Sequence, residues 1–269
     1  MHEKERHRII LSEVQGKPVV TVQELVELTG ASEATIRRDI ASLHVQQRLR
    51  RVRGGAEALS PPQFVGLAGR PFSVNETLNT EKKRAIAREA VALCEDGEPI
   101  IINGGTTTFQ MVHFLAHRRM PVLTNSFAIA EHLLRNSKNT VLLPGGTIYR
   151  EQSIILSPFE NDVARNFCAR RMFMGAQGLG PLGLMEADPL LIQAEQKLID
   201  QADELVVLVD STKFRQRSSL ILCSLSRIST VITDDGVEER EAKMLEAAGV
   251  ALIVARSPAT GEEDASLQA

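Results

Sequence analysis

The sequence predicts an α/β protein of two domains: a small N-terminal domain of short helices and a larger domain built around a mainly parallel sheet. The chain has 269 residues, more than one typical domain contains. Closely spaced helical patterns fill residues 1–57, whereas Val-, Ile- and Leu-rich segments alternate with helices over residues 79–256. Three prolines and two glycines mark residues 58–78 as a linker, and the polar, acidic residues 257–269 are expected to be a disordered tail.

A helix-turn-helix is expected near the N-terminus. Thr21, with Glu24 three residues later, has the spacing of a capping box before one helix, and Gly30 ends that helix. Ser32 can cap a second helix, in which Ile36 and later apolar residues share one face. The turn between the helices has the length that a helix-turn-helix uses, and glycine there can adopt conformations that other residues resist.

A β-hairpin, or wing, is expected after the second helix, because residues 48–55 alternate polar and apolar side chains and close on two glycines. Residues 1–56 contain 10 Lys or Arg against 7 Asp or Glu, a charge of +3, and the rest contains 21 against 27, a charge of −6. The net charge of −3 therefore hides a local basic cluster, which is typical of a phosphate-binding surface.

Double-stranded DNA is the expected partner of this domain. A recognition helix enters the major groove with its N-terminal end first, while arginines along the helix and the wing reach bases or phosphates. The candidate DNA-binding residues are Ser32, Glu33, Ala34, Thr35, Arg37, Arg38, Arg48, Arg50, Arg51 and Arg53. The alternative for Arg37 and Arg38 is a solvated basic helix face. Asp39 is expected to form a salt bridge with Arg37 or with a neighbouring helix, not a base contact.

The larger domain is expected to alternate strands and helices. The strands are expected at residues 99–102, 121–124, 140–143, 171–174, 205–209, 230–233 and 250–254. The helices are expected at residues 82–94, 108–117, 128–136, 187–201 and 238–248.

Small glycine- or hydroxyl-rich loops follow several of these strands. In open parallel sheets, ligands bind at the carboxyl ends of strands, and backbone N–H groups at a helix start attract phosphate. The loops are neither a P-loop nor a dinucleotide-binding fingerprint, because the required glycine spacings are absent. Lys213, after the strand expected at 205–209, adds a cation. Together with the loops, it predicts a polar pocket for an anionic ligand. Its candidate residues are Asn103, Gly104, Gly105, Thr106, Thr107, Thr124, Asn125, Gly145, Gly146 and Lys213.

The composition argues against several other classes. The three cysteines are far apart and have no clustered histidines beside them, so we expect no disulfide framework, no metal site and a reducing compartment. No cofactor is expected either. The absence of tryptophan and the single tyrosine argue against stacking on single-stranded nucleic acid. No signal pattern or long apolar run occurs, so a cytoplasmic protein with no membrane partner is expected.

Residues 31–40 and 49–56 resemble the recognition helix and the wing of the DeoR family of bacterial transcriptional regulators. The 103–107 loop and residues 209–214 are similar to that family's sensor domain. Shorter matches to the sensor domain are Thr124-Asn125, Gly145-Gly146, and Glu195 with Lys197. The resemblance implies a fold like that of ribose-phosphate isomerase, an effector that is a phosphorylated sugar or sugar acid, and Ser153, Glu195 and Lys197 as further effector-binding residues.

Three positions depart from the family pattern. Gln47 stands where the family usually has glycine, and Asn103 stands where it commonly has aspartate. Ile154 follows Ser153, where the family commonly has glycine. The last two variants are similar to the repressors of ascorbate utilisation within the family.

Two functions are compatible with these residues. The first is a homo-oligomeric regulator, a dimer or tetramer, that represses a carbohydrate or sugar-acid operon and leaves its operator when the effector binds; the sequence does not distinguish repression from activation. The alternative is a sugar-phosphate isomerase fused to a DNA-binding domain, for which Asp188, Glu195 and Lys197 offer suitable groups. Asn103 disfavours this alternative because it removes a carboxylate from the first loop, so we expect no enzymatic activity.

Overall fold

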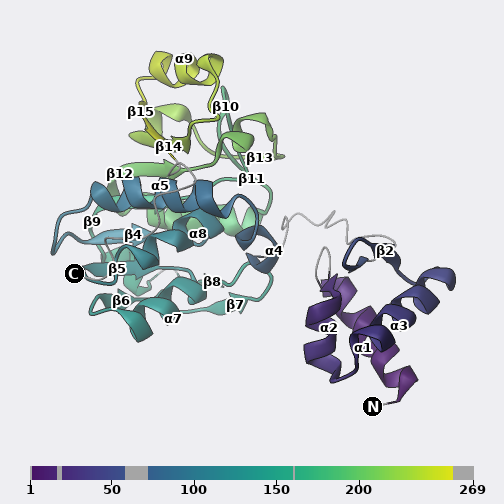
Figure 1. The fold of residues 1–269 in the computed structure, drawn as a ribbon. Coiled ribbons are helices and arrows are strands. Elements are labelled where there is room, and N and C mark those ends of the chain that lie inside the picture. Colours follow the sequence, from purple (N-terminus) through teal and green to yellow (C-terminus); the bar gives the residue numbers. More distant parts are fainter. Residues whose placement is uncertain (1, 17–19, 58–71, 160, 257–269) are drawn as a thin grey trace. The chain divides into compact units, whose positions relative to one another are not determined.

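The computed structural model of the chain describes residues 2–16, 20–57, 72–159 and 161–256 (Figure 1). The contacts divide the chain into two units, Met1–Leu67 and Ala68–Ala269, each with a core of its own. The tail expected at 257–269 and most of the linker expected at 58–78 lie outside the described residues. In the described part of the chain, no helix is long and apolar enough to cross a membrane.

The N-terminal unit combines three helices with a small antiparallel sheet, as far as it is described. The helices are α1 (Glu3–Gly16), α2 (Val22–Thr29) and α3 (Glu33–Val45). The strands, in the order β1-β3-β2, are β1 (Val20–Thr21), β3 (Gly55–Glu57) and β2 (Arg50–Val52). Ile10, Leu25, Ile36, Leu43 and Leu49 are completely buried between these elements.

The expected turn between α2 and α3 is confirmed in detail. Thr21 and Glu24 form a capping box at the start of α2. Gly30 ends the helix with a φ of 65°, a left-handed conformation that glycine adopts without a steric cost. The Ser32 side chain then accepts a hydrogen bond from the N–H of Thr35 and caps α3.

The larger unit is built on a seven-stranded sheet whose neighbouring strands are all parallel among the described residues. In order across the sheet the strands are β15 (Ala251–Ala255), β14 (Thr230–Asp234), β12 (Ala202–Leu208), β9 (Ala169–Met174), β4 (Ile100–Ile102), β5 (Pro121–Thr124) and β6 (Thr140–Leu142). The expected mainly parallel sheet is therefore confirmed.

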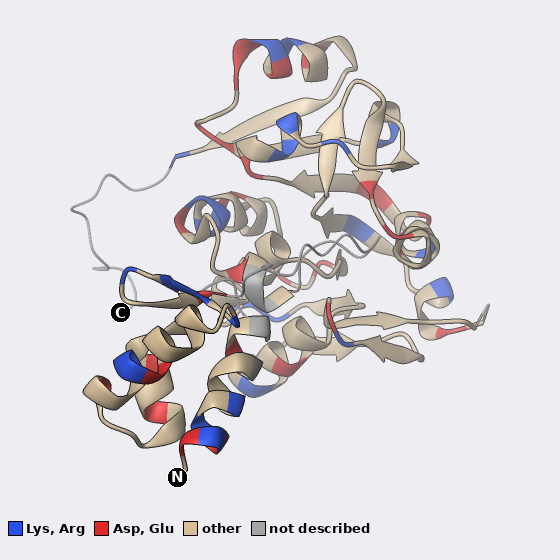
Figure 2. Cartoon of the chain, turned by 90° about the vertical axis from the view of Figure 1, so that its right-hand side faces the viewer, with Lys and Arg blue, Asp and Glu red and all other residues tan. Residues whose placement is uncertain are grey.

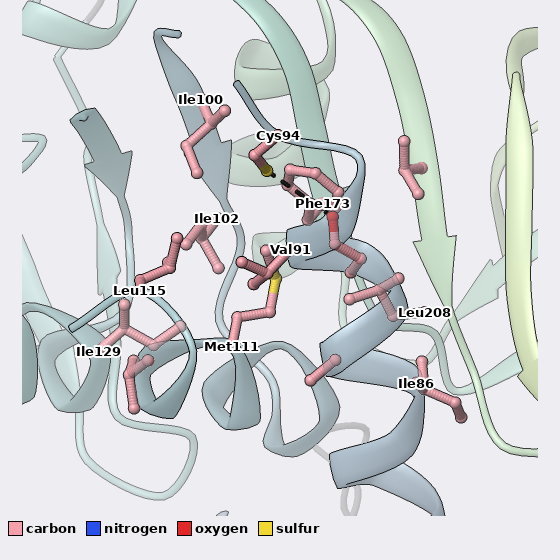
Figure 3. Packing of buried hydrophobic residues seen from close by; sticks show 14 of the residues in the cluster. Ile86, Val91, Cys94, Ile100, Ile102, Met111, Leu115, Ile129, Phe173 and Leu208 are labelled. Atoms are coloured by element: carbon pink, nitrogen blue, oxygen red, sulfur yellow. Dashed lines mark hydrogen bonds between the residues drawn. The ribbon is translucent and has the colours of Figure 1, made fainter. Parts of the chain in front are cut away.

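Helices and loops bury both faces of this sheet. The helices are α4 (Phe72–Glu76), α5 (Thr80–Ala92), α6 (Thr106–Phe109), α7 (Phe127–Asn136), α8 (Pro189–Ile199) and α9 (Glu239–Ala247). In β4, Ile100 and Ile102 pack into one core with α5 and α7, whereas Ile101 packs into the other core with α8 and α9. Figure 3 shows the first core, with Met111 and Phe173 between the helices and the sheet. This alternation explains why the strands are apolar throughout.

Several elements differ from the sequence prediction. The helix expected at 108–117 is split into α6 and the 3-10 segment η1 (Gln110–His113), and three consecutive β-branched threonines in α6 disfavour a longer helix. The small sheet β10 (Gly178–Gly180), β11 (Gly183–Glu186) and β13 (Leu220–Cys223), and the hairpin β7 (Thr147–Tyr149) with β8 (Ile154–Leu156), were not expected. Their strands are too short to show a period of two. The helix α4 falls within the range expected to be linker.

Candidate functional site

The outer surface of α3 carries the side chains expected to meet DNA. Ser32, Glu33, Ala34, Arg37 and Arg38 are exposed, and Thr35 is half-buried. Figure 2 shows acidic and basic segments interspersed along the helices of the N-terminal unit. Since Ile36, Ile40 and Leu43 face the core, α3 presents its polar side outwards. This is the arrangement that a recognition helix requires.

Four of these side chains already have partners in or next to the helix. The Arg37 guanidinium donates to Glu33 Oε1 through Nε at 2.9 Å and through a terminal nitrogen at 2.5 Å. The Ser32 hydroxyl is engaged as the cap of α3 and lies 2.9 Å from the Thr35 hydroxyl. In contrast, Arg38 makes no ion pair within the described residues. Arg38 is therefore the helix arginine best placed to neutralise a phosphate.

Asp39 lies on the buried side of α3 and joins it to α1. Its carboxylate accepts hydrogen bonds from Arg6 Nε at 2.8 Å and from a terminal nitrogen of Arg6 at 3.3 Å, and the His7 ring nitrogen Nε2 lies 3.3 Å away. The hydrogen bond to Asp39 raises the pKa of Arg6. Asp39 thus bonds to a neighbouring helix and not to Arg37, and it holds the recognition helix α3 against α1.

The wing consists of the β2–β3 hairpin, with Arg48 just before it and Arg53 in its turn. Arg48, Arg50, Arg51 and Arg53 are all exposed, and Arg50 pairs with Glu57 across the hairpin at 3.1 Å. The preceding corner contains Gln47 with a φ of 53°. This left-handed conformation is costly for any residue but glycine, which explains why glycine suits this corner.

The candidate effector site lies at the carboxyl ends of β4 and β5. Asn103 directly follows β4, and its Nδ2 donates to Glu195 Oε1 on α8 at 2.7 Å. The N–H of Gly104 donates to Asn125 Oδ1 at 2.8 Å, which joins the loop after β4 to the loop after β5. Thr124 is fully buried and its hydroxyl accepts from the N–H of Ser126 at 3.0 Å. The predicted loops after these two strands therefore meet.

Three polar atoms at this junction are buried without a hydrogen-bond partner in the described structure: Asn103 Oδ1, Asn125 Nδ2 and Glu195 Oε2. The N–H of Gly104 fixes the oxygen of the Asn125 amide, and Asn103 faces Glu195 with its Nδ2. Because an unsatisfied buried polar atom costs about 1–3 kcal/mol, such a cluster favours a bound molecule that supplies the missing partners. An acceptor, a donor and a carboxyl group side by side suit a ligand with several hydroxyls.

Glu195 is protonated over much of the neutral pH range. Burial first, and then the nearby Glu186 carboxyl, raise the pKa of its carboxyl to about 8, against the opposing effect of the hydrogen bond from Asn103. Burial also raises the pKa of Glu186, which has Asp188 and Lys213 as charged neighbours. The site thus combines the Glu195 carboxyl, held neutral, with Lys213, which lies within electrostatic range of Glu186.

The hairpin β7–β8 closes one side of the glycine loop. A Cβ atom built on Gly104 would lie 2.6 Å from Cγ1 of Ile154, so the Ile154 side chain occupies the space beside this glycine. The carbonyl of Ser153 accepts from the N–H of Phe127 at the start of α7. Ile154 therefore lies beside the glycine loop that Asn103 begins, so two departures from the family pattern are neighbours in the structure. The effector contact implied for Ser153 stays a prediction.

Other candidates occupy different positions. Thr106 and Thr107 begin α6 directly after Gly105, at the glycine loop. Gly145 and Gly146 are exposed at the start of the hairpin, where a Cβ on Gly146 would collide with the carbonyl oxygen of Leu156, so Gly146 is needed for the hairpin to form. Lys197 does not pair with Glu195; its Nζ donates to the backbone carbonyls of Ser157 and Phe159. Lys213 donates to Gln216 and lies within electrostatic range of Glu186.

Sequence reasoning missed Lys83 and Glu186. Lys83, near the start of α5, is 4% exposed, and burial lowers the pKa of its ammonium to about 8, with Asp210 and Lys213 as charged neighbours. Glu186 ends β11 in the small sheet that was not expected. The adjacent lysines at positions 82 and 83 are the only sequence signal, and they look like a solvated helix start.

Comparison with known proteins agrees with this architecture. A DeoR-like helix-turn-helix domain matches residues 6–61, and a DeoR C terminal sensor domain matches residues 78–235. The chain is 34% identical over 257 residues to the HTH-type transcriptional regulators UlaR of Shigella dysenteriae serotype 1 and of Escherichia coli K12, covering 94% of this chain and 99% of each relative.

Solved structures give weaker likenesses. Ribose 5-phosphate isomerase A of Methanocaldococcus jannaschii aligns with a TM-score of 0.38 at 20% identity, over 50% of this chain and 54% of the isomerase. The eIF2B beta subunit of Chaetomium thermophilum aligns with a TM-score of 0.39 at 12% identity, over 56% of this chain and 48% of the eIF2B subunit. These scores are too low to carry an argument about activity.

A winged helix-turn-helix joined to an α/β domain with a polar site at its strand ends defines a DNA-binding transcriptional regulator with a sensor domain. The chain belongs to the DeoR family of such regulators. It is a regulator and not an isomerase.

Proposed function

We propose that this regulator represses a carbohydrate or sugar-acid catabolic operon, and that a phosphorylated sugar or sugar acid releases it from operator DNA. The observation that carries the proposal is the buried junction of Asn103, Asn125 and Glu195, where three polar atoms lack partners in the described structure. A polyhydroxylated molecule supplies both donors and acceptors for them. The Asn103 and Ile154 variants resemble the ascorbate-utilisation repressors of the family, which supports a sugar acid as the effector class.

The cationic groups near the site support an anionic substituent on the effector. Lys83 has Lys213 and Asp210, in the loop after β12, as charged neighbours. A phosphate group accepts hydrogen bonds from ammonium groups and is attracted to them in a partly buried site. The hydroxyl-binding and cationic ends together favour a phosphorylated polyol over a neutral sugar.

The DNA contacts proposed are those of α3 and the wing. Arg38, Arg48, Arg51 and Arg53 are exposed and unpaired within the described residues, so each is available to a phosphate. Ser32, Glu33, Ala34 and Thr35 lie at the helix end that enters a major groove, where they would face base edges. A homo-oligomer, a dimer or a tetramer, would present recognition helices to repeated half-sites.

A thermal-shift screen of the full chain tests the effector class. Ribose 5-phosphate, glucose 6-phosphate, 6-phosphogluconate and other phosphorylated sugar acids are compared with the same compounds without phosphate. We expect at least one phosphorylated compound to raise the melting temperature of the wild type and to raise it less in Lys213→Ala. The exposed Lys138→Ala serves as the matched control and should respond as the wild type. No response to any anionic compound would refute the sensor function.

A further inference from the structure

The short helix α4 contacts three parts of the candidate effector site. The Phe72 ring packs edge-on against Phe109 of α6, with the ring centroids 5.6 Å apart, and α6 directly follows the glycine loop. The N–H of Phe72 donates to the carbonyl of Glu151, in the turn of the β7–β8 hairpin, at 2.8 Å. The third contact comes from Lys83, whose Nζ donates to the backbone carbonyl of Asn75. A rearrangement of the site would therefore change the contacts that hold α4.

Lys83 is an unusual group to find in this contact, because it is a buried cation bonded to a neutral atom. It is 4% exposed, and within the described residues its ammonium makes no ion pair. Its charged neighbours are Asp210, Lys213 and Glu76. A buried ammonium in such surroundings gains strongly from an anion that approaches it closely.

The same neighbours connect Lys83 to the effector site. Lys213 lies within electrostatic range of both Lys83 and Glu186, and Glu186 lies within electrostatic range of Glu195. An anionic substituent between Lys83 and Lys213 would therefore belong to a ligand whose hydroxyls reach Glu195. It would also relieve the repulsion between the two ammonium groups.

We propose that Lys83 couples effector binding to DNA release. The anionic group of the effector draws the Lys83 ammonium away from the carbonyl of Asn75, and α4 loosens from the sensor domain. The loss is substantial because a hydrogen bond from a charged donor is roughly twice as strong as a neutral one. α4 is the first described element of the sensor domain after the DNA-binding unit, and we infer that its loosening weakens the binding of that unit to the operator. This inference rests on the proposed function and adds the path by which occupancy is transmitted.

Hydrogen exchange and operator binding of the full chain test this coupling without any metabolite. Lys83→Met removes the charge and keeps the length of the side chain, and Phe72→Ala weakens the ring contact of α4 and leaves all the charges in place. We expect faster exchange of the amides of residues 72–76 in both variants, and operator binding weaker by about tenfold, a typical coupling between sites. Lys243→Met, which changes an exposed lysine paired with Glu239 on α9, is the control and should match the wild type.

Exchange at residues 72–76 equal to that of the wild type in both variants would overturn the proposal, as would faster exchange with operator affinity within twofold of the wild type. If one of the two variants does not fold, the exchange rates and operator affinity of the other test the proposal alone. A wild type that does not bind operator DNA would instead refute the proposed function, and the exchange rates would still show whether Lys83 holds α4 in place.

Discussion

Nδ2 of Asn103 donates to Oε1 of Glu195 at 2.7 Å, and this bond joins the end of β4 to α8 inside the protein. The two residues are 92 positions apart in the chain. The bond leaves the second oxygen of Glu195 without a partner among the described residues. The protonation of Glu195 therefore governs both the stability of the sensor domain and the hydrogen bonds it can offer to an effector.

Glu195→Gln should stabilise the protein at pH 8 and leave its stability nearly unchanged at pH 4.5. Burial raises the pKa of Glu195 to about 8, so the folded state retains a proton that the unfolded state releases above about 4.5. The stability contributed by the neutral acid is therefore complete below the unfolded pKa and is lost as the pH rises towards 8. The glutamine cannot ionise, and from the two pKa values we expect a gain on the order of 4 kcal/mol at pH 8. Urea unfolding at the two pH values measures it.

The exposed Glu246 provides the control for this measurement, because Glu246→Gln should show no comparable dependence on pH. Equal stability of Glu195→Gln and the wild type at pH 8 would mean that Glu195 is ionised in the folded protein at little cost.

Gln47→Gly should stabilise the N-terminal unit by up to about 1 kcal/mol. Gln47 has a φ of 53°, which is strained for a residue with a Cβ atom, although glycine also gives the unfolded chain more freedom. The gain is checked by slower hydrogen exchange in α3 and β2. Gln46→Gly, at the adjacent position with a φ of −75°, should be destabilising instead, and the reverse order of the two variants would contradict the explanation.

Gly104→Ala should destabilise the sensor domain by about 1–3 kcal/mol, the usual range for overpacking. The added methyl group would lie 2.6 Å from Cγ1 and 2.9 Å from Cδ1 of Ile154. Because Ile154→Ala removes both atoms, the double variant should lose less stability than the two single variants together. Thermal unfolding of the four proteins measures this coupling, and strict additivity would show that the two side chains do not compete for space.

Arg6→Met should loosen the recognition helix. Without Arg6, the Asp39 carboxylate loses its guanidinium partner and, among the described side chains, keeps the ring of His7 as a neighbour. We expect faster amide exchange in α3 and weaker DNA binding, although neither residue faces the groove. Arg8→Met changes an exposed arginine on the same helix α1 and serves as the control. If α3 exchanges equally in both variants, Asp39 does not fix the helix through Arg6.

The features that the sequence predicts are those that depend on near neighbours in the chain. The caps at Thr21 and Ser32 and the turn at Gly30 depend on residues within a few positions, and the structure confirms them. The parallel strands are also predictable, because burial on both faces makes them apolar throughout.

The contacts that build the effector site are less predictable. Nothing local indicates that Asn103 bonds to Glu195, or that Ile154 fills the space beside Gly104. Lys83 resembles any lysine at the start of a helix, and its burial and its bond to the carbonyl of Asn75 in α4 are visible only in the structure. Nor does the sequence indicate that Lys197 bonds to the backbone carbonyls of Ser157 and Phe159; its contact with an effector stays a prediction.

The salt dependence of operator binding by the wild type and by Arg38→Ala tests the central claim most directly. Duplexes from the region around the protein's own gene are titrated over a series of salt concentrations, with Arg135→Ala, an exposed arginine of α7, as the control. We predict affinity that falls steeply with salt in the wild type and the control, and a slope smaller by about 0.9 in Arg38→Ala, the value for one phosphate contact. An unchanged affinity and slope in Arg38→Ala would contradict the placement of α3 against DNA.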